Sequence, residues 1–405
     1  MFVLGLVVQK YGGSSVADAD KIKNVAERII ERKKSGDDVV VIVSAMGKTT
    51  NNLLALAREI SSNPPKREMD RLISTGELIT ISLLSMMLNE LGYEAISLTG
   101  RQAGIITEGS FMKSKIADVK SDNIKKHLDQ NKIVVVAGFQ GVNDLEEITT
   151  LGRGGSDTSA VAIAAKLQCP CEIYTDVDGI YSIDPRLYPD AKKLSQISYE
   201  EMMEMAHLGA KVMEPRSVEI AAKYNVPLTV GLNTGNLAGT VIKEYDKGME
   251  QKSITGLSAT DNVLLVTINN IPYGENNTAN IFTKLAEENV NIDMISQSSP
   301  LDNNTVRISF TTNKDDAKAI EKVMDELKNS IDGINYQTEE DLVKVSVIGN
   351  GMRDQSGVAA NVFKLFADNN IEFLQVTTSE ISISYIIDSI DKDKTVNVLA
   401  KALGL

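Results

Sequence analysis

The chain repeats part of itself near its carboxyl end, and this repeat limits what the second half can fold into. Ala279-Asn280-Ile281-Phe282 recurs as Ala360-Asn361-Val362-Phe363, 81 residues further along. A predicted strand precedes each copy, Val263–Ile268 or Val343–Ile348, and each copy is read as a helix that another strand follows. Two similar units of this size predict two βαβ-type modules packed together. A duplicated module at the end of a chain suggests a sensing role.

Residues 1 to about 245 follow a different pattern, in which β-rich apolar runs alternate with helical spacing. Such alternation predicts a layered α/β domain with a largely parallel sheet. With 405 residues, the chain is long enough for two or three domains. The charged stretch Lys243–Lys252 predicts a linker. The predicted strands are Val3–Val8, Val39–Val43, Ile133–Ala137, Glu172–Thr175 and Leu228–Val230, and the predicted helices are Lys21–Lys34, Glu77–Leu91, Thr158–Leu167 and Tyr199–Met205.

Charge and composition argue against several classes of protein. A formal net charge of −13 disfavours nucleic acid and anionic membranes as partners. No uninterrupted apolar run approaches the ~18 residues of a membrane span. Met1–Val8 has no basic flank, so it predicts a first strand and not a signal peptide. Cys169 and Cys171 are too close to bridge readily and too few for a zinc site, which predicts free thiols in a reducing cytosol.

Two loops rich in small residues follow predicted strands. In Lys10-Tyr11-Gly12-Gly13-Ser14-Ser15, glycines allow backbone N–H groups to approach phosphate oxygens, and the lysine adds a positive charge. The spacing is not that of a Walker A motif, and a plain structural turn is the alternative. Ser44–Asn51 supplies hydroxyl groups for a small polar ligand, although the same residues are common helix caps.

Two further segments lie at predicted helix starts. Ser74-Thr75-Gly76-Glu77 fits either a capping box or a glutamate that holds a substrate ammonium. Gly152-Arg153-Gly154-Gly155-Ser156-Asp157 combines glycines, a cation and an acid at a helix N-terminus, which predicts a pocket for a zwitterion or a phosphate. Asp157 has the alternative role of an N-cap.

The last segment of this kind is Tyr174–Tyr181, followed by Asp184-Pro185-Arg186. Its carboxylates lack the EF-hand spacing, so a loop that faces a nucleotide is the better interpretation. Lys211 adds a cation downstream, whereas His127 and His207 lie outside all these loops and are interpreted as structural.

Taken together and in this order, these segments resemble those of the aspartate kinases (aspartokinases) of the amino-acid kinase superfamily, over nearly the whole chain. The resemblance implies a three-layer α/β sandwich over residues 1–245 with a mainly parallel sheet, and a linker over 246–252. Two βαββαβ regulatory domains of the ferredoxin-like ACT type would follow, over 253–336 and 337–405. Whether the last strand and helix fold back into the first of them stays open. The segment Met213-Glu214-Pro215-Arg216 departs from the family pattern, so no contact is assigned to Glu214.

The resemblance also implies a reaction, the ATP-dependent phosphorylation of the L-aspartate side-chain carboxylate to 4-phospho-L-aspartate. That carboxylate is ionised at pH 7, so no general base is needed, and Mg²⁺ would travel on the nucleotide without a metal site of the protein's own. Lys10, Arg153 and Asp157 are the catalytic residues implied. The ATP side would comprise Lys10, Tyr11, Gly12, Gly13, Thr175, Asp176, Tyr181, Arg186, Lys211 and Val212, and the aspartate side Ser44, Thr50, Glu77, Arg153, Gly154, Gly155 and Ser156.

The resemblance further implies feedback inhibition at the ACT domains by lysine, threonine or both, in a cytoplasmic enzyme at the first step towards lysine, diaminopimelate, threonine and methionine. Asp293 would take the effector's ammonium, and an exposed loop acid without a ligand is the alternative for this residue. A homo-oligomer through the ACT domains, and a separately made regulatory subunit beginning near Met249, are also expected from relatives. The effector site would comprise Ile271, Gly274, Glu275, Ala279, Asn291, Ile292, Asp293, Gln297 and Ser298.

Two other hypotheses fit parts of the sequence. A glutamate or acetylglutamate kinase would share the superfamily fold, but such enzymes generally lack the tandem repeat, and the Arg153–Asp157 segment argues against them. An amino-acid sensor without catalysis is the other alternative, and the retained cations argue against it.

Overall fold

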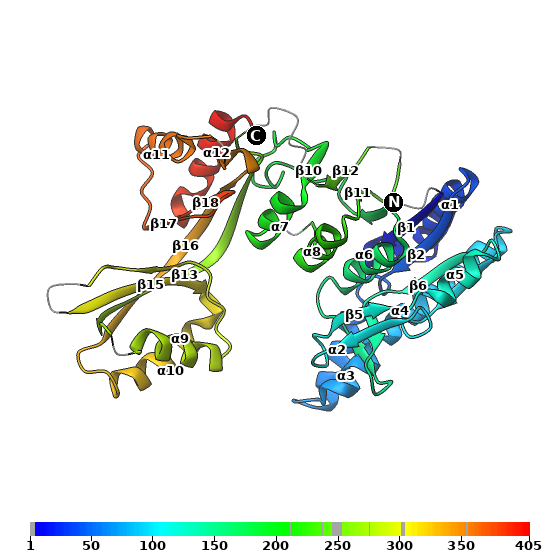
Figure 1. Cartoon of the computed structure of the whole chain (residues 1–405), viewed down its shortest axis with the longest axis horizontal. Coiled ribbons are helices and arrows are strands. Elements are labelled where there is room, and N and C mark those ends of the chain that lie inside the picture. Colours follow the sequence, from blue (N-terminus) through cyan, green and yellow to red (C-terminus); the bar gives the residue numbers. More distant parts are fainter. Residues whose placement is uncertain are drawn as a thin grey trace. The chain divides into compact units, whose positions relative to one another are not determined.

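The computed structural model describes residues 5–210, 212–235, 238–244, 253–274, 276–300, 304–353 and 355–405. The chain forms two compact units (Figure 1). The first unit comprises Met1–Tyr181 and Lys192–Glu250, and the second comprises Ser182–Ala191 and Gln251–Leu405. The short segment Ser182–Ala191 therefore belongs with the second unit, which differs from the single boundary predicted near residue 245.

The first unit is built on an eight-stranded sheet in the order β10-β12-β11-β9-β1-β2-β6-β3. All neighbouring strands are parallel except the antiparallel pair β11 and β12. The strands are β1 (Leu6–Tyr11), β2 (Asp38–Val43), β3 (Ala95–Leu98), β6 (Ile133–Ala137), β9 (Cys171–Thr175), β10 (Gln196–Ser198), β11 (Leu228–Leu232) and β12 (Thr240–Lys243).

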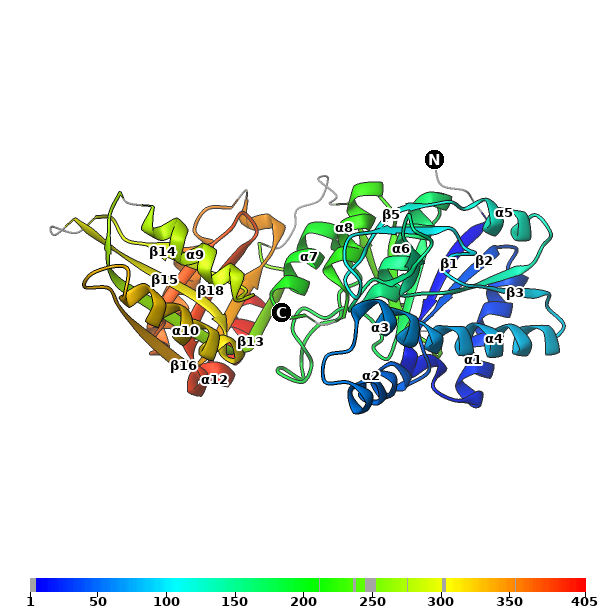
Figure 2. The same cartoon turned by 90° about the horizontal axis from the view of Figure 1, so that it is seen from below.

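Helices cover both faces of this sheet, which confirms the predicted layered α/β architecture (Figure 2). Along β2, Val39, Val41 and Val43 point to one layer of helices, while Val40 and Ile42 are buried on the opposite face. Strands buried on both faces read as continuous apolar runs, which is why they are recognisable in the sequence. The helices α1 (Ala19–Lys34) and α4 (Thr75–Glu90) lie on one face, and α5 (Asp122–Leu128), α6 (Gly155–Leu167) and, beyond α6, α8 (Pro215–Tyr224) lie on the other.

A smaller four-stranded sheet in the order β5-β4-β7-β8 lies beside α3. The helix α3 runs into α4, and together Lys66–Glu90 is long and apolar enough to cross a membrane by length and composition alone. Half of its most apolar window is buried inside the protein, as in the core helix of a folded domain. The remaining elements are α2 (Thr49–Ile60), α3 (Lys66–Ile73), α7 (Tyr199–His207), β4 (Ile105–Glu108), β5 (Lys115–Val119), β7 (Gln140–Val142) and β8 (Ile148–Thr150).

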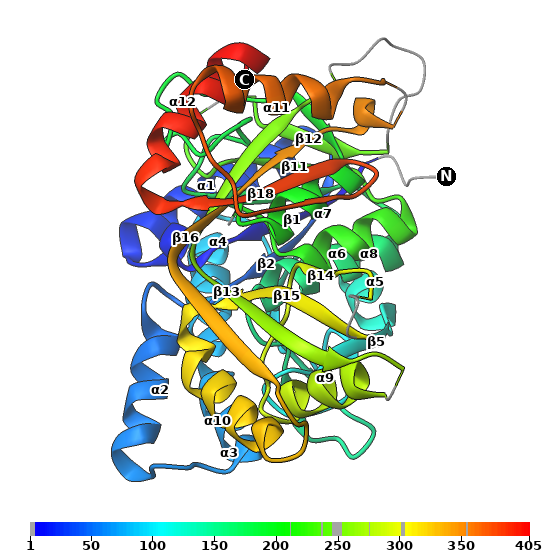
Figure 3. The same ribbon diagram turned by 90° about the vertical axis from the view of Figure 1, so that its left-hand side faces the viewer.

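The second unit has one antiparallel six-stranded sheet in the order β14-β15-β13-β16-β18-β17. Two long strands, β13 and β16, run through both repeats, with α9 and α10 at one end and α11 and α12 at the other (Figure 3). The elements are β13 (Gly256–Pro272), α9 (Asn277–Glu287), β14 (Ile295–Gln297), β15 (Thr305–Asn313), α10 (Ala317–Lys328), β16 (Asn335–Ile348), α11 (Val358–Asp368), β17 (Gln375–Thr378), β18 (Ser382–Asp388) and α12 (Lys392–Leu403).

Each repeat has its own core, and the two are connected through the long strands. The first repeat uses the far end of β13, and the second uses the far end of β16. The start of β13, residues 256–260, pairs with 344–348 of β16 and so completes the second repeat. The last helix, α12, packs into the core of the second repeat. Both long strands thus cross between the repeats, and the start of β13 supplies a strand to the second repeat.

Two local details differ from the sequence-based expectations, and a third expectation falls outside the described residues. The first strand is Leu6–Tyr11 and not Val3–Val8, of which Val3 and Leu4 lie outside the described residues. Tyr11 pairs with both Val43 and Tyr174 and is fully buried, so the strand continues through Lys10 to the first glycine. Ser74 is helical and makes no cap, because α3 and α4 are nearly continuous there. The linker over 246–252 lies outside the described residues.

Candidate active site

The candidate site is assembled at the carboxyl ends of neighbouring parallel strands, where loops of an α/β sheet meet. The loop after β1 contacts the loop after β2, since the Gly47 N–H donates to the Gly13 carbonyl at 3.0 Å. It also contacts β9, since the Gly12 N–H donates to the Tyr174 carbonyl at 3.4 Å. Three of the segments selected from the sequence are therefore adjacent in space.

Lys10 and Asp157 form an ion pair at the centre of this region. Lys10 Nζ lies 2.6 Å from Asp157 Oδ1, and only 11% and 14% of the two side chains are exposed. Asp157 is the third residue of α6, so its carboxylate lies in the first turn, where the helix dipole stabilises negative charge. Asp157 is not the N-cap of this helix, since Gly154 holds that position. The geometry combines a buried cation with a helix N-terminus, which suits an anionic ligand.

Two glycines allow the loops to approach one another this closely. A Cβ atom at Gly13 would lie 2.6 Å from the Ala45 carbonyl oxygen. Gly154 has a φ of +65°, a conformation that other residues rarely adopt, and its Cβ would lie 2.5 Å from the side chain of Glu214. A side chain at either position would force the loops apart.

Glu77 is a buried carboxylate with one unsatisfied oxygen. Its Oε1 accepts the Ala45 N–H at 3.1 Å, while Oε2 has no hydrogen-bond partner among the described residues. Burial raises the pKa of the Glu77 carboxyl from 4.5 to about 7, although hydrogen bonds from the backbone oppose this effect. Since Ser74 makes no capping box, Glu77 is available to receive a ligand ammonium.

A second buried carboxylate, Asp70 on α3, joins this helix to the segments around Met112 and Thr150. It was not selected from the sequence. It accepts the Met112 N–H at 3.0 and 3.1 Å, the Thr150 N–H at 3.0 Å and the Thr150 hydroxyl at 2.5 Å. Burial raises the pKa of the Asp70 carboxyl, and these hydrogen bonds counteract the rise. Because Thr150 ends β8 just before Arg153, Asp70 positions the loop that carries Arg153.

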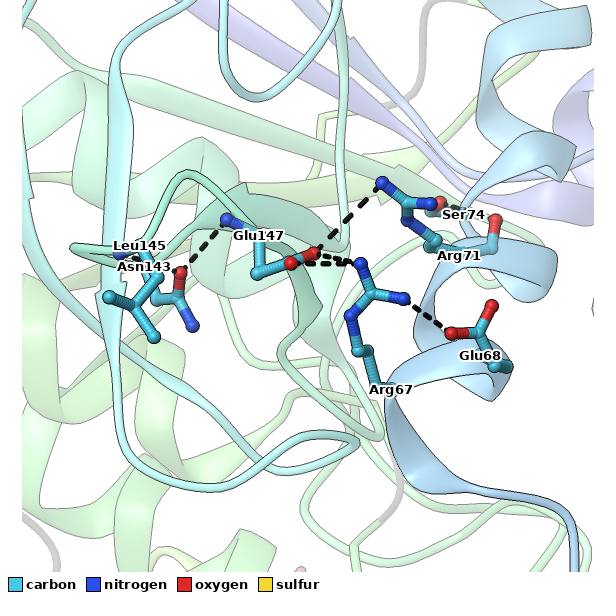
Figure 4. Close-up of polar contacts among 7 residues, drawn as sticks. All are labelled: Arg67, Glu68, Arg71, Ser74, Asn143, Leu145 and Glu147. Atoms are coloured by element: carbon cyan, nitrogen blue, oxygen red, sulfur yellow. Dashed lines mark hydrogen bonds and ion pairs between the residues drawn. The ribbon is translucent and has the colours of Figure 1, made fainter.

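Charged side chains on α3 also contact the turn between β7 and β8, close to the Thr150 contact of Asp70 (Figure 4). Both Glu147 oxygens accept from Arg67 Nη2 at 2.8 Å, and Arg71 lies 4.0 Å from Glu147. The Asn143 side chain closes the turn by accepting the Leu145 and Glu147 N–H groups. Partly exposed ion pairs of this kind contribute little stability, so their main effect here is to set the position of α3 against β7 and β8.

Glu214 and Arg216 are further residues that the sequence did not assign. The side chain of Glu214 lies against Gly154, and burial raises the pKa of its carboxyl, with the nearby Asp157 raising and Arg153 lowering that pKa. The Arg216 guanidinium donates to the Leu151 carbonyl at 2.8 Å and the Ser114 carbonyl at 3.1 Å. In the sequence, only the departure of this segment from the family pattern could have indicated that these two residues lie near the site.

The residues assigned to the nucleotide side fall into three groups. In the first unit, the Thr175 hydroxyl donates to Asp176 at 3.0 Å and the Tyr181 hydroxyl donates to Asp178 at 3.0 Å. Lys193, which was not predicted, also donates to Asp178 at 3.1 Å. Arg186 lies in the second unit, where it pairs with Asp184 at 2.5 Å. Lys211 lies outside the described residues, and Val212 directly follows it.

Around the predicted effector site, Ser298 contacts β15 and Gln297 contacts the start of α9. The Ser298 hydroxyl accepts the Arg307 N–H at 3.0 Å, and the Thr278 hydroxyl donates to Gln297 at 3.5 Å. Ile271 is fully buried in the core of the first repeat, and Gly274 lies in the turn before α9 with a φ of +89°. Glu275 lies outside the described residues.

The carboxylate of Asp293 is already paired within the chain. Lys344 on β16 donates to it, a contact that sequence reasoning missed. The signal in the sequence was a lysine between two valines of the predicted strand Val343–Ile348. The other assigned residues, Ala279 at the start of α9 and Asn291 and Ile292 just before Asp293, are at least partly exposed.

The fold and the site together define the class of amino-acid kinases, here joined to two similar repeats. Residues 5–231 match the amino acid kinase family, and residues 278–332 and 345–403 each match the ACT domain.

The chain belongs to the aspartokinase family. It is 48% identical over 407 residues to the aspartokinase of Bacillus sp. (strain MGA3), which covers 99% of this chain and 98% of that protein. Among solved structures, E. coli aspartokinase III in complex with aspartate and ADP gives a TM-score of 0.81 at 24% identity, with 99% and 100% of the two chains covered. The same enzyme in complex with lysine and aspartate gives a TM-score of 0.79 at 25% identity, with 98% and 99% covered.

Proposed function

We propose that this enzyme transfers the γ-phosphoryl group of ATP to the side-chain carboxylate of L-aspartate, producing 4-phospho-L-aspartate and ADP. The reaction would be the first step towards lysine, diaminopimelate, threonine and methionine, in the cytoplasm. The observation that carries the proposal is the buried pair of Lys10 and Asp157 at the N-terminus of α6. The names of full-length relatives supply further support.

The proposed chemistry needs charge neutralisation and positioning more than proton transfer. A carboxylate oxygen of aspartate attacks the γ-phosphorus, and the bond to the β-phosphate oxygen breaks. Lys10 neutralises the charge that accumulates on the transferred group. Arg153 holds the α-carboxylate, and Glu77 receives the ammonium through its unsatisfied oxygen. Ser44, Thr50 and Gly154–Ser156 complete this side.

The residues present fit Mg²⁺ carried on the nucleotide. Among the described residues, no group of three or more His, Cys, Asp or Glu side chains gathers as a ligand set, whereas Mg²⁺ commonly needs only one or two carboxylates beside substrate phosphates. When bound, Mg²⁺ would neutralise phosphate charge. Asp157 would be the carboxylate that meets it, and because a Cβ at Gly12 would lie 3.5 Å from Lys10 Nζ, the glycine would leave room there for phosphate oxygens.

Regulation by end-product amino acids is part of the same proposal. Lysine, threonine or both would bind at the ACT domains around Asp293, in a homo-oligomer formed through these domains. E. coli aspartokinase III has been solved in complex with lysine and aspartate, which supports lysine as the first candidate. A regulatory fragment beginning near Met249 would appear as a second band when native material is separated on a gel.

The direct test is ADP release by the purified full-length enzyme. We expect release with L-aspartate and little with L-glutamate or without an amino acid. Release with glutamate instead would point to another member of the superfamily. No release with any amino acid would favour a sensor without catalysis.

A further inference from the structure

The second unit contains a buried ammonium whose carboxylate partner is half exposed. Lys344 lies in β16 with 6% of its side chain exposed, whereas 46% of its partner Asp293 is exposed. Its neighbours Val343 and Val345 point into the core beneath α11 and α12, so Lys344 points to the other face of the sheet. The pair therefore joins the second repeat to the segment that precedes β14 of the first.

A buried acceptor without a partner lies on the same face. Gln375 on β17 is 9% exposed, and its Oε1 has no hydrogen-bond partner among the described residues. Its Nε2 donates to the Ser296 hydroxyl on β14 at 3.3 Å.

Gln375 and Lys344 are neighbours across the sheet. Both lie directly opposite Ile386 of β18, so the two side chains share one row and one face. Their Cα atoms are two strand spacings apart, about 10 Å, which the combined lengths of a lysine and a glutamine side chain span. The unpaired oxygen of Gln375 is therefore an alternative acceptor for the Lys344 ammonium.

We propose that Lys344 is an internal competitor for the effector's ammonium. Lys344 pairs with Asp293 in this structure, and binding of a free amino acid at Asp293 moves the Lys344 ammonium to the Gln375 carbonyl oxygen. The inference rests on the effector role of Asp293 within the proposed function. The two arrangements, Lys344 paired with Asp293 or with Gln375, are two states for which a regulatory ligand would have different affinities.

The unequal burial of the two partners explains why an exchange is needed. Asp293 remains partly solvated when its partner leaves, whereas a buried ammonium without an acceptor is costly. Gln375 supplies that acceptor. Because Gln375 also donates to Ser296, the new contact changes the surroundings of both β14 of the first repeat and β17 of the second.

The test compares amino-acid binding by full-length variants, using calorimetry with L-lysine and with L-threonine. Lys344→Met removes the competitor but keeps an unbranched side chain, and we expect whichever amino acid binds the wild type to bind about fivefold more tightly. Gln375→Met removes the second acceptor, and we expect binding about fivefold weaker. Lys344→Arg keeps the cation and should stay within twofold of the wild type.

A matched pair in the same unit provides the control. Lys392 pairs with Asp261 at 2.7 Å, with 18% and 56% of the side chains exposed, so Lys392→Met should leave binding unchanged. Unchanged or weaker binding in Lys344→Met, while Lys344→Arg and Lys392→Met bind as the wild type does, would overturn the inference, and so would a wild type that binds neither amino acid. Calorimetry does not depend on turnover, so failure of the kinase proposal would appear separately, as absent ADP release.

Discussion

Each unit contains a buried lysine paired with an aspartate, and the two pairs differ in what surrounds them. Lys10 and Asp157 lie where parallel strands end and α6 begins, and both side chains are nearly buried. Lys344 and Asp293 join the middle of an antiparallel strand to a loop, and only the lysine is buried. The carboxylate of the first pair therefore lies in the first turn of a helix, whereas that of the second pair is partly exposed to solvent.

The two pairs differ in which charged side chain remains stabilised when its partner is removed. The first turn of α6 stabilises the Asp157 carboxylate without Lys10, so Lys10 is free to contact an incoming phosphate. No helix N-terminus among the described elements supports Asp293, and Lys344 is the partner that needs an acceptor. Under the two proposals, the first pair would receive an anion and the second would exchange one cation for another.

The largest effect is expected from a substitution that removes the ion pair between Lys10 and Asp157. Lys10→Ala should lower kcat for ADP release about 10³-fold, because charge on the transferred phosphoryl group is no longer neutralised. The fold should survive, as circular dichroism would show, because Asp157 keeps the helix N-terminus. Lys23→Ala, an exposed change on α1, is the control. A kcat close to that of the wild type would remove the role assigned to Lys10.

The next effect concerns Glu77, the carboxylate proposed to receive the substrate ammonium. Glu77→Gln should lower kcat/KM for aspartate roughly 30-fold, mainly through KM, because a charged hydrogen bond is lost. In the wild type, kcat/KM should fall as the pH drops below about 7, since Glu77 then takes up a proton. Glu90→Gln, at the exposed end of the same helix, should change neither value.

The same pKa also has a consequence for stability. Between pH 4.5 and about 7 the folded state keeps the Glu77 proton that the unfolded chain releases, so stability falls as the pH rises through this range. Glu77→Gln should flatten that part of the profile in chemical denaturation. An unchanged slope would contradict the burial assigned to this carboxyl.

The third effect tests the asymmetry of the second pair. Asp293→Ala should lower the free energy of unfolding of the second unit by roughly 2 kcal/mol, because it leaves the Lys344 ammonium buried without a strong partner. Lys344→Met should cost less than half as much. Asp293→Ala should also desensitise the enzyme to its effector while sparing kcat. Equal losses of stability in the two variants would remove the distinction drawn between the partners.

The smallest effect concerns Glu214, whose negative charge lies close to Arg153. Glu214→Gln should lower KM for aspartate about twofold with little change in kcat, because Arg153 then attracts the substrate anion more strongly. Glu219→Gln, exposed on the same helix, is the matched control. A raised KM would instead indicate that Glu214 helps to position Arg153.

Much of the fold and part of the site followed from local pattern. The buried strand Val39–Val43 and the helix Lys21–Lys34 were predicted nearly to their observed bounds. The segments around Lys10, Ser44 and Asp157 were selected for residue types that suit phosphate and zwitterion binding. Asp70 and Lys193 were not selected, since nothing beside them in the sequence distinguishes them from surface charges.

The sequence by itself determined the alternating α/β domain, the two repeats and the glycine-rich loops, because these depend on periodicity and on residues close together in the chain. Only the tertiary structure decided that residues 256–260 complete the second repeat, that Glu214 lies against Gly154 and that Lys344 contacts Asp293. Each of these contacts joins residues tens of positions apart. Their proximity is a result of how the whole sheet and its helices pack, which no local pattern encodes.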